Sequence, residues 1–262
     1  MLPLVEYIRY LGKQCRLLTK NLAFKRAHPN VALPPAHLAF DAYGSNNWMS
    51  YWKEGKLVAS WVVDKLSEHK ENCKTVLEWG CGPGRVIRHI PSLLQDLDCF
   101  GTDYNQESIL WCSDNIPGIR FAENNLLPPL PFAENMFDAV YAISVVTHLS
   151  EQCCLHWMDE LYRVLKPNGL LLIWTNGDRI SQLILPEEKA EYDLGHFVVR
   201  SRYEEGKKMF LSFHPPEWVH SRLLQHFDIL CHYSEECPGS QDVWAARVVK
   251  QDLSNNLAGG NA

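Results

Sequence analysis

Short apolar segments alternate with amphipathic helical segments through the middle of this chain. The predicted strands are Thr75–Glu78, Asp98–Thr102, Ile119–Ala122, Phe137–Ile143 and Leu170–Thr175. The predicted helices between them are about Arg85–Leu94, Gln106–Asp114 and Glu151–Leu165. Such alternation is typical of a parallel sheet covered by helices on both faces. The last of these strands is a continuous apolar run, as expected when both faces of a strand are buried.

The pattern becomes less regular after residue 175. Residues 176–208 are polar and irregular, and we interpret them as an insertion or lid within the same domain. Small polar residues close the sequence and predict a flexible tail over 251–262. The elements predicted between these two segments are a strand at Met209–Phe213, a helix at Pro215–Phe227 and strands at Asp228–Tyr233 and Val243–Val249.

The segment before the alternating region is predicted to be helical. Leu2–Arg26 carries apolar residues at helical spacing and many basic residues against a single acid, Glu6. Such a basic amphipathic helix either packs on the domain, covers its ligand site or contacts a membrane surface. A second helix is predicted over 47–70, with an interruption near Gly55. We therefore expect a helical extension or lid over 1–70 and a single α/β domain over 71–250.

Composition narrows the range of partners and compartments. The net charge of −6 and the pI near 6.0 argue against a nucleic-acid partner, so a small molecule is expected. The nine cysteines contain no C-x-x-C pair and no spacing with histidine that suggests zinc, so we expect reduced thiols and no metal site. No apolar run is long enough to span a bilayer, and Met1–Lys20 lacks a signal-peptide pattern. A cytoplasmic protein is expected.

The first strand of the alternating region leads into a turn with three glycines, V-L-E-W-G-C-G-P-G-R over 76–85. Glycines this close together indicate that the backbone turns sharply or touches a ligand. A dinucleotide-binding turn would need a small residue where Arg85 stands, and a Walker loop would need a following G-K-[ST]. Neither pattern is present, although a dehydrogenase that tolerates Arg85 remains an alternative.

The spacing E-x-G-x-G-x-G resembles the first motif of the class I S-adenosylmethionine-dependent methyltransferases. The resemblance continues in order through F-G-T-D-Y at 100–104, the region 121–140, and H-L-S-E followed by E-L-Y-R-V-L-K-P-N-G. It covers about 75–175. It implies a Rossmann-like, doubly wound, seven-stranded sheet in three α/β/α layers, mostly parallel, with an antiparallel last strand. It also implies S-adenosylmethionine as cofactor and S-adenosylhomocysteine as product.

The resemblance assigns a role to each matching position. The glycine turn would approach the amino-acid arm of the cofactor, and Glu78 would meet its ammonium. Asp103 would hold the ribose hydroxyls, Tyr104 would pack on the adenine, and Asn125 stands where the family usually has an acid for the adenine amine. The implied cofactor-binding set is Glu78, Gly80, Cys81, Gly82, Gly84, Arg85, Asp103, Tyr104, Asn124, Asn125, Leu126, Ile143 and Ser144.

A general base is needed only if the methyl acceptor is a weakly acidic hydroxyl or a protonated amine. His148 follows the fourth strand, where the methyl group should point, and is the candidate base; a packing role is the alternative. His196 and His214 are weaker candidates. The aromatic residues Tyr43, Trp48, Tyr51 and Trp52 either line an acceptor pocket or form the core of a helix.

The acceptor itself is only broadly constrained. The chain lacks an [ND]-P-P-[FYW] motif after the fourth strand, which disfavours nucleic-acid bases and protein glutamine as acceptors. The resemblance favours a small metabolite, a sugar or a lipid-linked molecule that is methylated at oxygen. A lipid acceptor would also give the basic first helix a membrane to contact. An aminopropyltransferase and a non-catalytic scaffold with the same fold remain alternatives, and the sequence does not indicate an oligomeric state.

Overall fold

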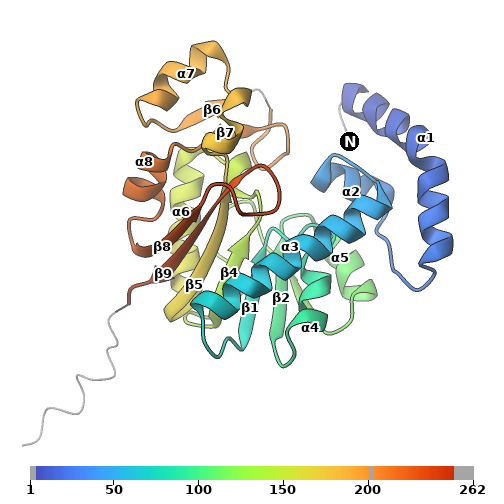
Figure 1. Cartoon of the computed structure of the whole chain (residues 1–262), viewed down its shortest axis with the longest axis horizontal. Coiled ribbons are helices and arrows are strands. Elements are labelled where there is room, and N and C mark those ends of the chain that lie inside the picture. Colours follow the sequence, from blue (N-terminus) through green and yellow to red (C-terminus); the bar gives the residue numbers. More distant parts are fainter. Residues whose placement is uncertain (1–3, 201–202, 251–262) are drawn as a thin grey trace, which may run out of the picture.

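A computed structural model describes residues 4–200 and 203–250 and has a seven-stranded central sheet (Figure 1). The strand order is β3-β2-β1-β4-β5-β9-β8, and the pairs from β3 through β5 are parallel. The last strand, β9, is antiparallel to both of its neighbours, so the predicted sheet is confirmed. The strands are β1 Thr75–Trp79, β2 Asp98–Asp103, β3 Ile119–Glu123, β4 Phe137–Ala142, β5 Leu165–Thr175, β8 Phe227–Tyr233 and β9 Asp242–Val248. The predicted tail at 251–262 lies outside the described residues.

The sheet is the middle of three layers because its side chains alternate between two cores. Leu77 joins the core that contains Trp157 of α6, whereas its neighbour Val76 joins the core that contains Val62 of α3. The helices of the domain are α3 Trp48–His69, α4 Ile90–Leu93, α5 Gln106–Asn115 and α6 Glu151–Val164. The reversal of strand order between β1 and β4 is where open α/β sheets place their ligands.

Two predictions about helices near the glycine turn were wrong. Helix α3 is not interrupted at Gly55; a Cβ atom there would lie 2.2 Å from the carbonyl oxygen of Arg85, so the glycine lets the helix pack directly on the turn. The helix expected from Arg85 is reduced to a 3-10 turn at Ile87–His89 and the short α4. Positive φ angles at all three glycines of the turn keep the backbone out of a right-handed helix up to that point.

The segment after β5 is more ordered than its polar sequence predicts. It forms a 3-10 helix at Asp178–Leu183, helix α7 at Pro186–Asp193 and strand β6 at Val198–Arg200. Strand β7, Leu211–Phe213, pairs with β6 in a separate two-stranded sheet and does not join the central sheet. The helix expected before β8 is only α8, Pro216–Trp218, followed by a π turn at Val219–Leu223.

Three helices precede the sheet, in agreement with the expected helical extension. Helix α1 covers Leu4–Ala27, and α2 covers Ala36–Tyr43, which the sequence pattern did not predict. Phe24, Trp48 and Tyr51 form a small core between these helices and α3, so Trp48 and Tyr51 are core residues. No helix in the described part of the chain is long and apolar enough to cross a membrane.

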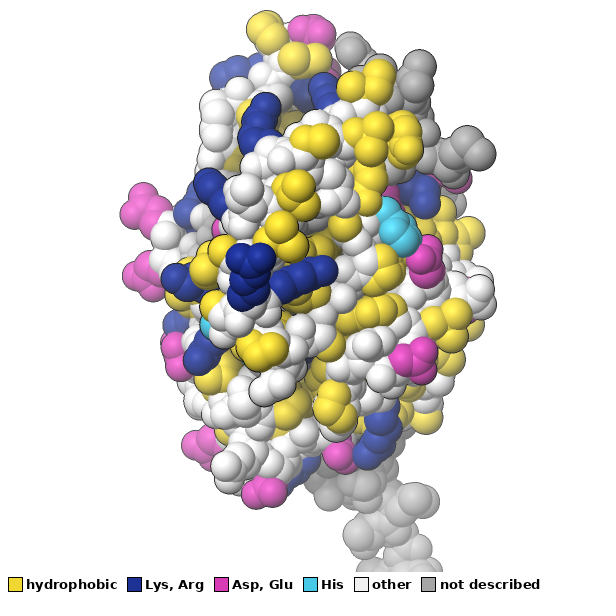
Figure 2. Space-filling view, turned by 90° about the vertical axis from the view of Figure 1, so that its right-hand side faces the viewer, with side chains coloured by type: hydrophobic (Ala, Val, Ile, Leu, Met, Phe, Trp, Pro, Cys, Tyr) yellow, Lys and Arg dark blue, Asp and Glu magenta, His cyan; other side chains and the backbone are white. Residues whose placement is uncertain are grey.

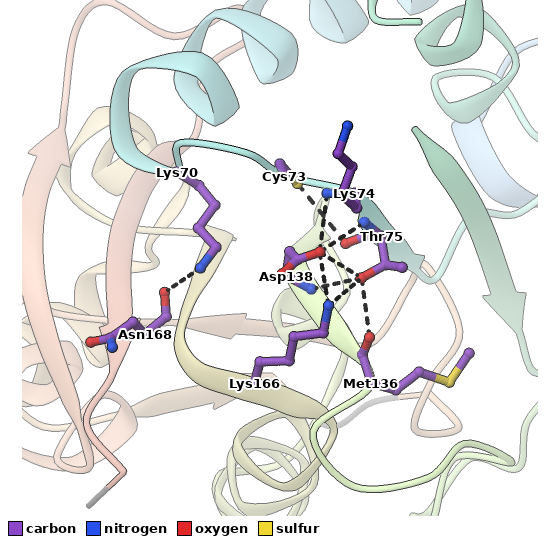
Figure 3. Close-up of polar contacts among 8 residues, drawn as sticks. All are labelled: Lys70, Cys73, Lys74, Thr75, Met136, Asp138, Lys166 and Asn168. Carbon is purple, nitrogen blue, oxygen red and sulfur yellow. Dashed lines mark hydrogen bonds and ion pairs between the residues drawn. The ribbon is translucent and has the colours of Figure 1, made fainter. Parts of the chain in front are cut away.

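The amino-terminal ends of the central strands are joined by the buried carboxylate of Asp138 (Figure 3). Oδ2 of Asp138 accepts hydrogen bonds from the backbone N–H groups of Lys74 and Thr75 at 3.0 Å and from the Thr75 hydroxyl at 2.9 Å. The ammonium of Lys166 lies 3.0 Å from the same oxygen. These contacts join the starts of β1 and β4 to β5 and hold the register of the three central strands.

Candidate active site

A cavity of about 500 Å³ opens at the carboxyl ends of β1, β2 and β4. Side chains predicted for the site converge on it from strands far apart in sequence, as a parallel sheet requires. The predicted residues that line it are Glu78, Gly80, Cys81, Gly82, Arg85, Asp103, Tyr104, Asn124, Asn125, Leu126, Ile143, Ser144 and His148. Gly84 is absent from this lining: a Cβ atom there would lie 2.4 Å from Cδ1 of Ile116, so it permits packing against the chain after α5.

The glycine turn forms one wall of the cavity with bare backbone. Gly80 has φ 76°, and a Cβ atom there would lie 2.3 Å from Cγ2 of Val145. Gly82 has φ 50°, and a Cβ atom there would lie 3.1 Å from the hydroxyl oxygen of Tyr43. The backbone N–H groups of Gly80 and Cys81 both donate to the carbonyl of Thr102 at 2.8 Å. The turn is thus fastened to the end of β2 and presents a smooth surface to a ligand.

Asp103 connects that turn to the end of β2. One carboxylate oxygen accepts from the backbone N–H of Gly82 and the other from that of Asn105, both at 2.8 Å. Burial raises the pKa of Asp103 to about 6, although these two amides lower it. Each carboxylate oxygen can accept more than one hydrogen bond, so Asp103 keeps acceptor capacity toward the cavity.

Glu78 is a second buried carboxyl group in the cavity wall. Its Oε2 accepts from the hydroxyl of Tyr141 at 3.0 Å, and burial raises its pKa to about 8. A cation bound beside it would favour the ionised form and lower this pKa. Glu78 is therefore suited to an ammonium ligand.

Arg85 and Tyr43 form the part of the wall nearest α2. The guanidinium carbon of Arg85 lies 4.3 Å from the centre of the Tyr43 ring, and the Arg85 backbone N–H donates to the Tyr43 hydroxyl at 3.3 Å. The buried Nε of Arg85 has no hydrogen-bond partner among the described residues. An unpaired buried donor of this kind fits a ligand that carries an acceptor such as a carboxylate.

The end of β3 offers a second unpaired group. Asn124 is buried, its Nδ2 donates to the carbonyl of Asn125 at 2.7 Å, and its Oδ1 is without a partner in the described part of the chain. Asn125 itself is exposed. Asn124 is therefore better placed than Asn125 to accept from an amine in the cavity, which changes the emphasis of the prediction. The Tyr104 hydroxyl donates to the carbonyl of Gly206 at 2.9 Å.

His148 ends the 3-10 turn Val146–His148 that follows β4, and its ring is oriented by the backbone. Its Nδ1 lies 2.8 Å from the carbonyl oxygen of Phe210, which can only accept, so Nδ1 carries the proton in the neutral ring. Burial lowers the pKa of His148 below its usual value, despite this hydrogen bond. Nε2 is then an unprotonated acceptor, and no described residue engages it.

The other histidine candidates lie outside the cavity lining. His214 is fully buried and accepts from the backbone N–H of Asn176 at 3.3 Å, and burial lowers its pKa to about 3. His196 lies on the surface beside Glu191. Neither histidine therefore faces the cavity.

Several lining residues come from segments that carried no sequence signal for a site. The hydroxyl of Ser144 lies 2.8 Å from Nε2 of Gln241, which places the loop before β9 at the cavity. The Lys208 ammonium donates to the carbonyl of Phe40 at 2.9 Å and joins the segment 203–210 to α2. The unpredicted lining residues include Leu38, Asp41, Ala42, Trp157, Gly206, Lys208, Met209 and Gln241.

Comparisons with known proteins find related methyltransferases. A family model described as a methyltransferase domain matches residues 76–169. The chain is 28% identical over 158 residues to a tRNA (carboxymethyluridine(34)-5-O)-methyltransferase of Arabidopsis thaliana, a match that covers 59% of this chain and 36% of the relative. It is 33% identical over 101 residues to a fatty-acid O-methyltransferase of Mycolicibacterium smegmatis, covering 38% of this chain and 36% of that relative. The matches thus span about a third of the length of each relative.

The fold also has counterparts among solved structures. A crystal structure of a SAM-dependent methyltransferase from Methanosarcina mazei superposes with a TM-score of 0.52 at 19% identity, covering 71% of this chain and 98% of that chain. At this level of identity, the likeness bears on the fold alone.

Proposed function

Since the chain belongs to the class I S-adenosylmethionine-dependent methyltransferases, we propose that it transfers a methyl group from this cofactor to an oxygen atom of a small-molecule, sugar or lipid-linked acceptor. One observation carries the proposal: a neutral His148 with a free Nε2 lines the same cavity as the glycine turn and Asp103. Both relatives are named as O-methyltransferases, which supports oxygen as the acceptor atom.

The residues of the cavity fit the parts of this cofactor. Asp103 has acceptor capacity for the ribose hydroxyls, and Asn124 has an unpaired carbonyl oxygen for the adenine amine. Glu78 suits the ammonium, and the unpaired Nε of Arg85 suits the carboxylate of the amino-acid arm. Gly80 and Gly82 leave room that a side chain would fill. When bound, S-adenosylmethionine supplies a methyl group on a positively charged sulfur.

The protein's part in the transfer is to position the acceptor and to take its proton. Transfer of the methyl group would form an oxygen–carbon bond as the carbon–sulfur bond breaks, and the sulfur would keep the electron pair of the broken bond. A hydroxyl acceptor must lose its proton, which Nε2 of His148 receives while Nδ1–H stays bonded to Phe210. Burial keeps the imidazole neutral and hence able to act as a base near neutral pH.

Calorimetric titration tests the cofactor part of the proposal. We expect binding of S-adenosylmethionine and S-adenosylhomocysteine, and no binding of NAD or of decarboxylated S-adenosylmethionine at comparable affinity. Preferred binding of the decarboxylated compound would instead favour an aminopropyltransferase. A folded protein that binds neither sulfur compound contradicts the proposal.

The acceptor class is tested with methyl-labelled cofactor. The protein is incubated with a lipid extract, a water-soluble metabolite extract and purified tRNA, each in a separate reaction. We expect label in the lipid or metabolite fraction, and loss of that label with a catalytically impaired variant. Label confined to tRNA contradicts the proposed acceptor, and binding without transfer to any fraction would favour a scaffold role.

A further inference from the structure

An ordinary surface helix buries its apolar side chains, but helix α1 turns most of its large apolar side chains toward solvent. The row that faces the protein includes the buried polar residues Glu6 and Asn21. Phe24 packs into the core with Trp48 and Tyr51, but other large apolar side chains of the helix point away from the protein: Ile8 is 60% exposed and Leu18 is 58% exposed. Packing on this domain therefore does not account for the exposed apolar residues of α1.

The exposed apolar residues form one continuous stripe. Ile8, Leu11, Cys15, Leu18 and Leu22 recur at i, i+3, i+7, i+10 and i+14, which is the spacing of a single helical face. All five are exposed. A stripe along most of a helix of 24 residues is longer than the scattered apolar residues of a normal surface.

A basic row accompanies the stripe. Arg9, Lys13, Arg16 and Lys20 follow one another at i, i+4, i+7 and i+11, on a face of the helix different from that of the apolar residues. Arg9 pairs with Glu6 at 2.8 Å and Lys13 donates to the carbonyl of Gly44, so the exposed Arg16 and Lys20 are the members of the row that the proposal uses. The helix carries six basic residues against one acid, whereas the whole chain has a net charge of −6. Figure 2 shows this side of the molecule, where yellow hydrophobic and dark-blue basic side chains gather together.

The inward polar residues show that this orientation is fixed by specific contacts. Asn21 donates to the carbonyl of Asn46 at 2.8 Å and accepts from the backbone N–H of Trp48 at 3.1 Å. Glu6 lies 3.5 Å from the ammonium of Lys208, which lines the cavity. Rotating the helix to bury its apolar stripe would break these contacts.

We propose that α1 docks on an anionic membrane surface, with the apolar stripe in the lipid and the basic row toward the phosphate headgroups. An exposed apolar face on a Lys- and Arg-rich helix is the pattern that binds this interface, and the positive charge distinguishes it from the dimer seams of neutral helices. The docked helix lies one layer from the cavity: Tyr10 packs edge-on against Phe40 of α2 at 5.3 Å, and α2 lines the cavity through Leu38 and Ala42.

Co-sedimentation of the full chain with vesicles tests this surface. The vesicles contain phosphatidylcholine alone or an equal mixture of phosphatidylcholine and phosphatidylglycerol. We expect binding to the mixed vesicles, with affinity at least tenfold lower for phosphatidylcholine alone. The affinity of the double variant Ile8→Glu/Leu18→Glu for the mixed vesicles should be at least tenfold lower than that of the parent. Arg16→Glu/Lys20→Glu should also bind more weakly, and its binding should no longer depend on the salt concentration.

A matched control separates the stripe from general hydrophobicity. Leu57 on α3 and Leu110 on α5 are 60% and 59% exposed, so Leu57→Glu/Leu110→Glu removes as much exposed apolar surface elsewhere and should bind like the parent. Equal loss in this control, or no binding of the parent to mixed vesicles, overturns the proposal.

Two other outcomes would identify a different partner. Binding to tRNA that depends on Arg16 and Lys20 but not on Ile8, without vesicle binding, assigns the row to nucleic acid. Concentration-dependent self-association that Ile8→Glu/Leu18→Glu abolishes, without vesicle binding, assigns the stripe to a second copy. Because vesicle binding needs no cofactor, this test is independent of the proposed methyl transfer.

Discussion

The carboxylate of Asp103 holds the backbone N–H of Gly82 at 2.8 Å and so joins the end of the second strand to the glycine turn. The same carboxylate accepts from Asn105 at the start of α5. One side chain therefore fixes the turn, the strand and the following helix relative to one another. Asp103 thus connects three segments that surround the cavity.

Replacing Asp103 tests its proposed role toward the ribose. Asp103→Ala removes the acceptor of two charge-assisted hydrogen bonds, each worth about 1.5–3 kcal/mol, so the affinity for S-adenosylmethionine should fall tenfold or more. Isothermal titration calorimetry measures this change. Asp98→Ala, an exposed aspartate at the other end of the same strand, is the matched control and should bind normally. Unchanged affinity in folded Asp103→Ala protein would reject the assignment.

His148 gives a kinetic prediction with a defined pH dependence. A base is active when unprotonated, so the transfer rate to a hydroxyl acceptor should rise with pH through the pKa of His148 and then level off. Because burial lowers that pKa, the rise should lie below the usual value of 6.5. His148→Ala should lower kcat by about 100-fold or more while cofactor affinity is kept. A variant with the parent's rate at every pH would return His148 to a packing role.

The sheet could be predicted because buried parallel strands are continuous apolar runs whose carboxyl ends meet at one side of the sheet. The resemblance to a known family then singled out Glu78 and Asp103 at strand ends and His148 shortly after a strand, and all three line the cavity. The place of Gly84 outside the cavity lining could not be predicted, because a positive φ and the lack of a side chain are equally consistent with contact to a ligand and contact to another part of the chain.

The other walls of the cavity could not be predicted because they depend on contacts between distant segments. Gln241 reaches Ser144 across nearly a hundred residues of sequence, and Lys208 reaches Phe40 across a still longer interval. The spacing of apolar and polar residues along the chain does not predict contacts between such distant residues. The orientation of α1 could not be predicted for a related reason. An amphipathic pattern shows that a helix has an apolar face, but it does not show whether that face turns toward the protein or away from it.

The carboxylate of Asp138 makes the starts of β1 and β4 sensitive to acid. Burial alone would raise the pKa of Asp138, but Lys166, the backbone amide of Lys74 and the hydroxyl of Thr75 lower it below its usual value overall. The stabilisation is therefore present above the pKa of the unfolded chain and is lost as the pH falls through the lower pKa of the folded protein. Asp138→Asn should cost about 1–3 kcal/mol at pH 7 and progressively less in acid. Urea unfolding at several pH values measures this, and a pH-independent difference would contradict it.

Two helical glycines provide a paired test of how α3 packs on the glycine turn. Gly55→Ala places a Cβ atom 2.2 Å from the carbonyl oxygen of Arg85, which is backbone and cannot move without shifting the turn. Such overpacking should cost about 1–3 kcal/mol and weaken cofactor binding, since Gly80 and Gly82 belong to the same turn. Gly12→Ala in α1 has no atom within 4 Å of the new Cβ and should stabilise the helix by up to about 1 kcal/mol. The midpoint of thermal unfolding should therefore fall in Gly55→Ala and rise in Gly12→Ala, and calorimetric titration should show weaker cofactor binding in Gly55→Ala alone. Equal effects of the two substitutions would show that the contact between Gly55 and Arg85 does not constrain the turn.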